Sequence, residues 1–267
     1  MPAVYPLTDG EWYARVAHNL SRGLPQFCPL PDQTRDRRSA TVIATGPSAK
    51  HSLDEIRRGR NGLTLAVNGA YSWLVSNGII PKGFMMIDPH EYSCEFVKPC
   101  RKDVMHVLAS ACHPKAFDIL LAAGCQVMVC NLWHPTLMEP NHGLPTVSIL
   151  QGGGSTVGLN AMVLCRALAH REIDVYGVDG CYSRGQHHAQ TSHPSGERKA
   201  TQKIQYAGRT YEVDDLQIAQ AQDIAMFARM FSPLIRAKFH GPGLAGAIWK
   251  KTREDLKRER KEGRLAA

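Results

Sequence analysis

Short, continuously apolar runs alternate with helix-like segments from residue 40 onward. The apolar runs cover residues 41–44, 63–67, 84–87, 104–109, 126–130 and 173–178, and all but 104–109 are followed within two residues by Gly, Asn or Asp. The segments 53–60, 70–76, 114–123 and 157–169 lie between the runs and have helical character. Strands that are apolar throughout are typical of a parallel sheet covered on both faces. The pattern therefore predicts an α/β fold with a mostly parallel sheet and helices on both faces.

The two ends of the chain depart from this alternation. Thr8 and Glu11 have the spacing of a capping box, which predicts a helix from there to about Arg22. Residues 24–38 contain three prolines and several charges, so we expect a linker there. We divide the chain into an N-terminal extension with a linker (1–38), a nucleotide-binding catalytic domain (39–249) and a basic helical tail (250–267).

The segment that follows the last apolar run is harder to place. Residues 184–205 contain three histidines and no apolar periodicity, which predicts a long mobile loop. Residues 211–236 have apolar positions at helical spacing and are predicted to be mainly helical.

Composition indicates an ordinary globular protein. Hydrophobic residues make up 43% and charged residues 21% of the chain, and no run approaches the roughly 18 apolar residues of a membrane helix. Residues 1–6 lack the basic and apolar segments of a secretory signal, so we expect a cytoplasmic location. The eight cysteines include no Cys-x-x-Cys pair, which favours reduced, mostly buried thiols over the alternative of a zinc site.

Basic residues are concentrated near the C-terminus. Residues 250–264 hold eight Lys and Arg against four Asp and Glu, so this segment contributes half of the formal net charge of +8. A solvated helix explains such a pattern. Contact with nucleic acid is the alternative, although no aromatic residues are interleaved with the charges.

Two loops of small residues are candidate phosphate sites. Gly46, Pro47 and Ser48 follow the first apolar run, and a second loop of small residues comprises Gly152, Gly153, Gly154, Ser155 and Thr156. Glycine lets the backbone approach a ligand, and the free N–H groups at the start of a helix attract phosphate oxygens. A plain strand-to-helix turn is the alternative for the first loop, and a flexible connection for the second. Neither loop is a Walker A motif.

Acidic residues follow two other apolar runs. Asp88 and Asp179 come directly after strands, where a parallel sheet places its ligand crevice. Mg²⁺ prefers one or two carboxylates together with phosphate oxygens, so both residues are candidate metal ligands and catalytic residues. Helix capping is the alternative role.

Three further residues near the same crevice carry polar groups suited to catalysis or binding. His187 and His188 follow Asp179, and a histidine there can act as a general base or bind phosphate; we select His188 as the candidate base. Tyr182 either donates its hydroxyl to a phosphate or packs.

Taken together, these motifs resemble the 6-hydroxymethylpterin diphosphokinase-like family, which is found in archaea, bacteria and phages. The resemblance covers roughly residues 40–182 and is carried by the order of Gly46-Pro47-Ser48, 65–70, 78–81, 84–88, 153–158 and 175–179. It implies a Rossmann-like fold that binds a nucleotide. The architecture is also similar to that of bacterial sialyltransferases and motility-associated flagellin glycosyltransferases.

The resemblance also implies roles for particular residues. By position, the nucleotide would be held by Gly46 to Ser48, by Asn68 and by Gly153 to Thr156, and His188 would correspond to the base of the sialyltransferases. Thr156 stands where valine is more usual, and the first loop lacks an extra Gly or Asn before Gly46.

Three functions follow as hypotheses. The first is transfer of diphosphate from ATP, with Mg²⁺, to a small molecule that carries a hydroxymethyl group. The second is glycosyl transfer from a CMP-activated sugar to a glycan or other acceptor. The third is a non-catalytic module that binds nucleotide, or nucleic acid through its basic tail.

Overall fold

An eight-stranded sheet organises the molecule in the computed structural model, which describes residues 7–29, 38–59, 62–138, 143–145, 148–150, 152–189 and 200–264. The strand order is β10-β7-β1-β2-β3-β4-β5-β6, and every pairing in this sheet is parallel. The strands are β1 (Arg38–Ile43), β2 (Leu63–Val67), β3 (Gly83–Met86), β4 (Met105–Ala109), β5 (Gln126–Leu132), β6 (Ile149–Leu150), β7 (His170–Tyr176) and β10 (Arg236–His240). The predicted α/β, Rossmann-like sheet is confirmed.

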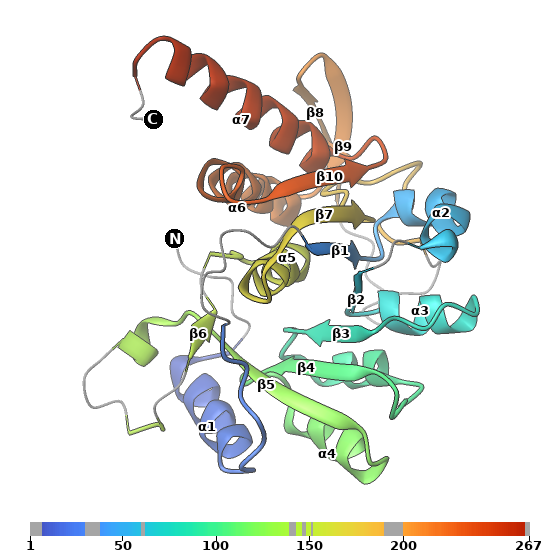
Figure 1. Ribbon diagram of the computed structural model, residues 1–267, viewed down its shortest axis with the longest axis vertical. Helices are drawn as coiled ribbons and strands as arrows, with labels where there is room; N and C mark the ends of the chain where they lie inside the picture. The colour runs from blue at the N-terminus through green and yellow to red at the C-terminus, as the bar shows by residue number, and fades with distance from the viewer. Residues whose placement is uncertain are drawn as a thin grey trace.

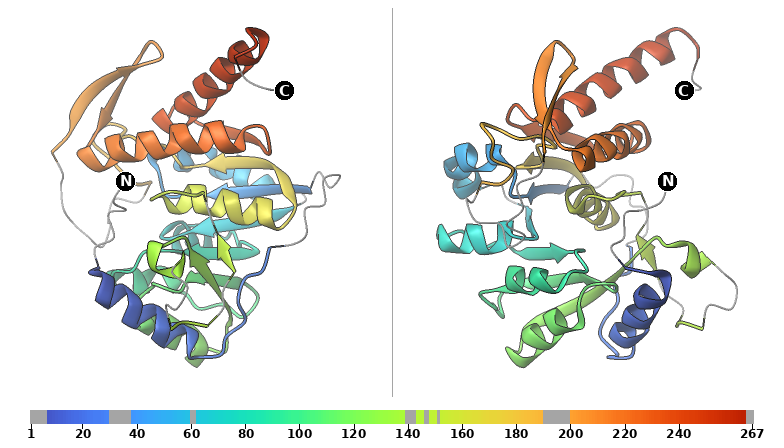
Figure 2. Two further views of the ribbon diagram at one scale, coloured as in Figure 1. Left: turned by 90° about the vertical axis from the view of Figure 1, so that its left-hand side faces the viewer. Right: turned by 180° about the vertical axis from the view of Figure 1, so that it is seen from behind.

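Helices cover both faces of the sheet (Figures 1 and 2). One face carries α5 (Val157–Ala167) and α6 (Asp215–Phe231). The other carries α2 (Leu53–Arg58), α3 (Ala70–Ser76) and α4 (Pro114–Ala122). At the ends of the chain lie α1 (Asp9–Leu20) and α7 (Leu244–Lys261), and short 3-10 helices occupy Pro47–Ser52 (η1), Glu91–Val97 (η2) and Pro135–Met138 (η3).

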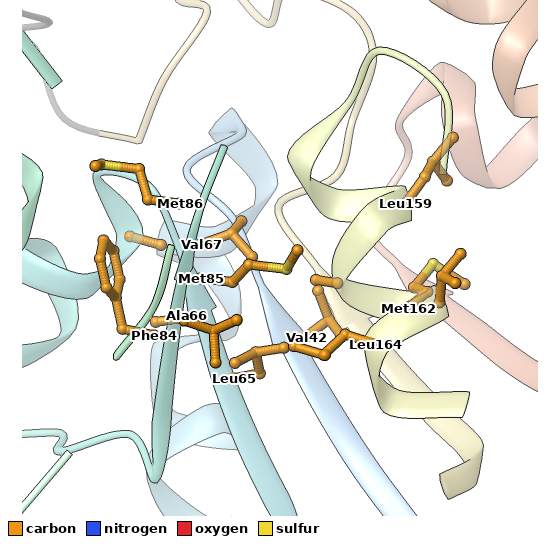
Figure 3. Packing of buried hydrophobic residues seen from close by; sticks show 14 of the residues in the cluster. Val42, Leu65, Ala66, Val67, Phe84, Met85, Met86, Leu159, Met162 and Leu164 are labelled. Carbon is orange, nitrogen blue, oxygen red and sulfur yellow. The ribbon is translucent and has the colours of Figure 1, made fainter. Parts of the chain in front are cut away.

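The core forms where the strands meet α5 (Figure 3). Met85 points toward α5, while its neighbours Phe84 and Met86 point to the opposite face, as the two-residue period of a strand requires. All three side chains are completely buried. Burial on both faces explains why these strands are apolar at every position.

The N-terminal helix begins where its sequence predicts. Thr8 accepts a hydrogen bond from the Glu11 N–H, and the Glu11 side chain accepts one from the Thr8 N–H, so the capping box is confirmed. Trp12 and Val16 are buried and belong to the main core. Residues 30–37 of the predicted linker lie outside the described residues.

The segment before β10 differs from its prediction. Residues 202–213 form a hairpin of β8 (Gln202–Tyr206) and β9 (Arg209–Val213), so the predicted loop ends earlier and residues 211–213 are not helical. The turn has positive φ angles at Ala207 (48°) and Gly208 (75°), as a two-residue hairpin turn requires. The middle of the predicted loop, residues 190–199, lies outside the described residues.

β10 was also missed by the sequence analysis. It is an edge strand whose residues alternate between charged and apolar, so it lacks the continuous apolar character of the inner strands. The helix that contains the predicted basic tail begins before residue 250, because α7 starts at Leu244.

Two further predictions concern the state of the cysteines and membrane-spanning helices. All eight cysteines are free thiols and six of them are buried, as predicted. Within the described ranges, no helix is both long and apolar enough to cross a membrane.

Candidate functional site

The first small-residue loop joins the carboxyl ends of β1 and β7. The Ala44 N–H donates to the Tyr176 carbonyl (2.8 Å) and the Gly46 N–H donates to the Gly177 carbonyl (2.7 Å), so the pairing continues beyond the strands. A Cβ atom at Gly46 would lie 2.3 Å from the Gly177 oxygen. Glycine is therefore needed at position 46 for the close approach of two backbones.

Ser48 and Asp179 form the centre of this junction. The Ser48 N–H and hydroxyl donate to the two carboxylate oxygens of Asp179, at 2.7 and 2.6 Å. Asp179 is only 6% exposed. Burial raises the pKa of the Asp179 carboxyl, although both hydrogen bonds from Ser48 act to lower it.

Two glycines that the sequence analysis did not select enclose the same pair. A Cβ atom at Gly241 would lie 2.5 Å from the Ser48 Cβ, and one at Gly243 would lie 2.6 Å from the Asp179 Cα. The Ala245 N–H, in the first turn of α7, donates to the Asp179 carbonyl (2.9 Å). The cluster of Gly and Pro at residues 241–243 was the available signal for this close packing.

The backbone N–H groups of the first loop are therefore already hydrogen-bonded to the protein itself. Pro47 has no N–H, and the N–H groups of Gly46, Ser48 and Ala49 all donate to protein oxygens. In this conformation Gly46, Pro47 and Ser48 form a fixed turn at the carboxyl edge of the sheet and do not present the open cradle of N–H groups that the sequence suggested.

The second small-residue loop has the same type of contact in a more open place. The Ser155 N–H and hydroxyl both donate to Oδ2 of Asp223 on α6, at 2.9 and 2.6 Å. Gly154 and Ser155 are exposed, and Asp223 is half-buried. Asp223 was not selected from the sequence, because nothing in the helical pattern of α6 marks it.

The second loop lies at the same edge of the sheet as the first. Thr156 caps α5 by accepting a hydrogen bond from the Leu159 N–H (3.3 Å). A Cβ atom at Gly158 would lie 2.8 Å from the side chain of Val178, which directly precedes Asp179. Gly153 packs on Asn160, where an added Cβ atom would lie 2.3 Å from the amide.

Asn68, at the end of β2, is strained and incompletely paired. Its φ angle is 45°, in the left-handed region that few residues other than glycine adopt. Its side-chain Oδ1 is buried and has no hydrogen-bond partner in the described part of the protein. The adjacent Gly69 lies next to the first loop, since a Cβ atom there would be 3.6 Å from Thr45.

The structure brings His188 to the first loop. Its Nδ1 lies 3.0 Å from the Thr45 hydroxyl, and the following Ala189 N–H donates to the Thr45 carbonyl (2.6 Å). His187 stacks on Tyr182 with ring centroids 5.0 Å apart. The segment 187–189 is thus fixed beside the end of β1.

The Tyr182 hydroxyl is already engaged by another residue. It donates to Asp214 (3.0 Å), the N-cap residue of α6. Burial and then this hydrogen bond raise the pKa of Tyr182 to about 12. In this structure its ring packs on His187 and its hydroxyl is used by Asp214.

Asp88 and Asp179 are not brought together. Asp88 accepts hydrogen bonds from the His90 N–H (2.9 Å) and the Tyr92 hydroxyl (2.9 Å). The strands that precede the two acids, β3 and β7, are separated by β1 and β2, which corresponds to about 14 Å at the usual strand spacing. One Mg²⁺ held by both carboxylates does not fit this arrangement. No group of three or more His, Cys, Asp or Glu with metal-binding geometry occurs among the residues that the structure describes.

A buried contact between His240 and Asp174 lies next to this junction, and it was missed because β10 was missed. His240 Nε2 lies 2.8 Å from an oxygen of Asp174 on β7, and the His240 ring stacks on Tyr176 at 4.1 Å. Both side chains of the pair are less than 10% exposed. The His240 carbonyl also accepts a long hydrogen bond (3.5 Å) from the Ser48 hydroxyl.

A comparison with models of known protein families shows the family to which the chain belongs. Residues 13–185 match the family described as 6-hydroxymethylpterin diphosphokinase MptE-like. The chain belongs to this family. The match contains both small-residue loops, Asn68 and both acids, whereas His188 lies just beyond it. The family resemblance inferred from the sequence is thereby confirmed.

A solved glycosyltransferase structure has the same fold. The MAf glycosyltransferase from Magnetospirillum magneticum AMB-1 is 14% identical, with a TM-score of 0.61 over 96% of this chain and 43% of that one. The chain thus spans less than half the length of that protein. A mammalian sialyltransferase is 12% identical, with a TM-score of 0.44 over 88% of this chain and 86% of its own. No curated protein matches the chain.

Proposed function

We propose that the protein is a nucleotide-dependent transferase whose donor binds at the carboxyl ends of β1, β2 and β7. The family description and the glycosyltransferase fold both support a transferase. The observation that carries the proposed position is Asn68, a half-buried residue with a strained backbone, whose buried side-chain Oδ1 has no partner in the described part of the protein. Backbone strain and an unsatisfied buried acceptor each cost about 1–3 kcal/mol, and both persist where they serve a ligand.

The Asn68 oxygen is suited to a nucleoside. As an acceptor, it takes a hydrogen bond from the exocyclic amino group of a base or from a ribose hydroxyl. The next residue, Gly69, lies close to Thr45, so the nucleoside would rest beside the first loop.

The donor's phosphates fit the second loop better than the first. Ser155 is exposed, and its two donors are held by a carboxylate that is itself partly solvated. A phosphate oxygen can replace Asp223 there, at the start of the 11-residue helix α5, whose N-terminal amides favour anions. The same exchange at Ser48 would require uncovering the buried Asp179.

His188 is our candidate for the base, and its contact with Thr45 at the end of β1 supports this role. A neutral imidazole there would accept the proton of an acceptor hydroxyl. That oxygen then attacks the transferred group, and the nucleotide leaves with the electrons of the broken bond.

Two transferred groups are candidates. The family description favours diphosphate: the acceptor oxygen attacks the β-phosphorus of ATP, the bond to the α–β bridging oxygen breaks and AMP leaves. The separation of Asp88 and Asp179 favours the second candidate, a CMP-activated sugar, because attack at a sugar carbon with loss of CMP needs no metal held between these acids.

A nucleotide panel measured by thermal shift distinguishes the candidates. ATP, AMP, CTP and CMP are each tested with Mg²⁺ and with chelator, on the wild type and on Asn68→Gly. Stabilisation by ATP that chelator abolishes supports diphosphate transfer, whereas stabilisation by CMP that chelator leaves intact supports glycosyl transfer. If no nucleotide stabilises the wild type, the proposal fails.

A further inference from the structure

The C-terminal helix α7 presents three different sides. The first is apolar and buried: Trp249 packs against Phe239 of β10 and Phe227 of α6, with ring centroids 5.6 and 6.0 Å apart. Leu256 is buried on the same side. Arg229 of α6 adds an ion pair to Glu259 (2.8 Å), so this side is fully used in attaching the helix to the body.

The second side carries paired charges. Asp255 accepts hydrogen bonds from Lys251 (2.7 Å) and Arg258 (2.9 Å). Tyr206 of the β8–β9 hairpin lies near Asp255. Burial is the main cause that raises the pKa of Tyr206, and the negative charge of Asp255 raises it further. Positive and negative charges are therefore balanced on this side.

The third side is a row of basic residues, which we call the basic stripe: Lys250, Arg253, Lys257, Arg260 and Lys261. They recur three or four residues apart, so they share one face of the helix. In the described part of the chain none of them forms an ion pair with an acid. The row is about 16 Å long, and Glu254 is the acid at its margin.

A basic pocket continues the stripe onto the body. A cavity of about 280 Å³ is lined by Arg171, Arg236 and Arg253, together with Glu172 and the turn at residues 232–235. Glu172 lies 3.6 Å from Arg236 and offsets part of its charge. Arg253 belongs to both the stripe and the pocket, which makes them one surface. The pocket lies at the amino ends of β7 and β10, opposite the edge that carries Asn68.

We propose that the basic stripe and its pocket bind the phosphate backbone of duplex nucleic acid. A duplex carries one negative charge per about 1.7 Å, so a straight basic row of this length can contact several phosphates. The stripe contains no aromatic residue on which unpaired bases could stack, which argues against single strands. The apolar side of α7 is buried against α6 and β10, so it cannot insert into a bilayer.

The position of α7 makes the surface accessible. Its C-terminal half projects beyond the sheet and the other helices (Figures 1 and 2). The proposal does not depend on the proposed transferase function, because its residues lie at the other edge of the sheet.

Fluorescence anisotropy with a labelled 20-base-pair duplex tests the proposal on the full chain. The variant Lys257→Gln/Arg260→Gln removes two charges from the stripe, and the matched control Lys251→Gln/Arg258→Gln removes two from the paired side of the same helix. We expect the stripe variant to weaken binding about tenfold at 100 mM salt. We also expect the negative slope of log K against log salt to become shallower by about 2 in the stripe variant. The control should bind nearly as the wild type does.

Three results would overturn the proposal. One is equal loss of binding in both variants, and another is failure of the wild type to bind the duplex at 50 mM salt. The third is binding to phosphatidylserine vesicles without binding to the duplex. Circular dichroism and thermal unfolding of both variants check that the compared proteins are folded.

Discussion

The two small-residue loops are built alike and differ in exposure. In each, one serine donates both its N–H and its hydroxyl to a carboxylate from a distant segment, Ser48 to Asp179 and Ser155 to Asp223. Asp179 is 6% exposed and enclosed by glycines, whereas Ser155 is open to solvent. The same pair of donors thus forms a buried contact in the first loop and a solvent-exposed contact in the second, where we propose that a phosphate can replace Asp223.

The largest expected effect is a difference in folding stability between substitutions at the two loops. Asp179→Asn replaces one acceptor oxygen by an amino group that faces a Ser48 donor, so we expect a loss of about 3 kcal/mol in unfolding free energy. Asp223→Asn can keep the single oxygen that accepts both Ser155 donors, and it lies at the exposed loop, so it should cost less than about 1 kcal/mol. Urea unfolding of both variants measures the difference, and equal losses would contradict the contrast between the loops.

The stability effect at Asp179 should depend on pH. Its folded-state pKa is raised above the ordinary value of 3.8, so its titration favours the folded state most in acid. That contribution is lost as pH rises from 3.8 through the folded-state pKa. The difference in unfolding free energy between wild type and Asp179→Asn should therefore be larger at pH 3.5 than at pH 7. A difference that grows with pH would show that the folded-state pKa is lowered.

A smaller effect concerns the nucleoside. Asn68→Gly removes the side-chain amide and suits the positive φ angle, so folding stability should be kept or slightly raised. Nucleotide affinity should fall about fivefold, the equivalent of one ordinary hydrogen bond. Ala207→Gly, at a positive φ angle in the hairpin turn, is the matched control and should bind as the wild type does. Unchanged affinity in Asn68→Gly, measured by calorimetry, would remove Asn68 from the site.

The sequence was sufficient for the inner sheet and for the edge of the sheet at which we propose the site. Continuous apolar runs identify β1 to β5 and β7 because these strands are buried on both faces. Parallel strands place their carboxyl ends together, so Asn68 and Asp179 could be selected from their positions alone.

The partners of these residues could not be predicted in the same way. That Ser48 would engage Asp179 depends on β1 lying next to β7, which no local pattern encodes. Asp223 lies within a helix and reaches Ser155 only through the packing of α6 beside α5. The expected metal pair did not form, because the strands that precede Asp88 and Asp179 are not neighbours.

The exchange of Asp223 for phosphate at Ser155 is the central claim, and one titration tests it most directly. Calorimetry compares wild type and Asp223→Asn with the nucleotide that gives the largest thermal shift. Removing the competing negative charge should tighten binding about threefold or more. Unchanged or weaker binding in Asp223→Asn would contradict the account and place the phosphates elsewhere.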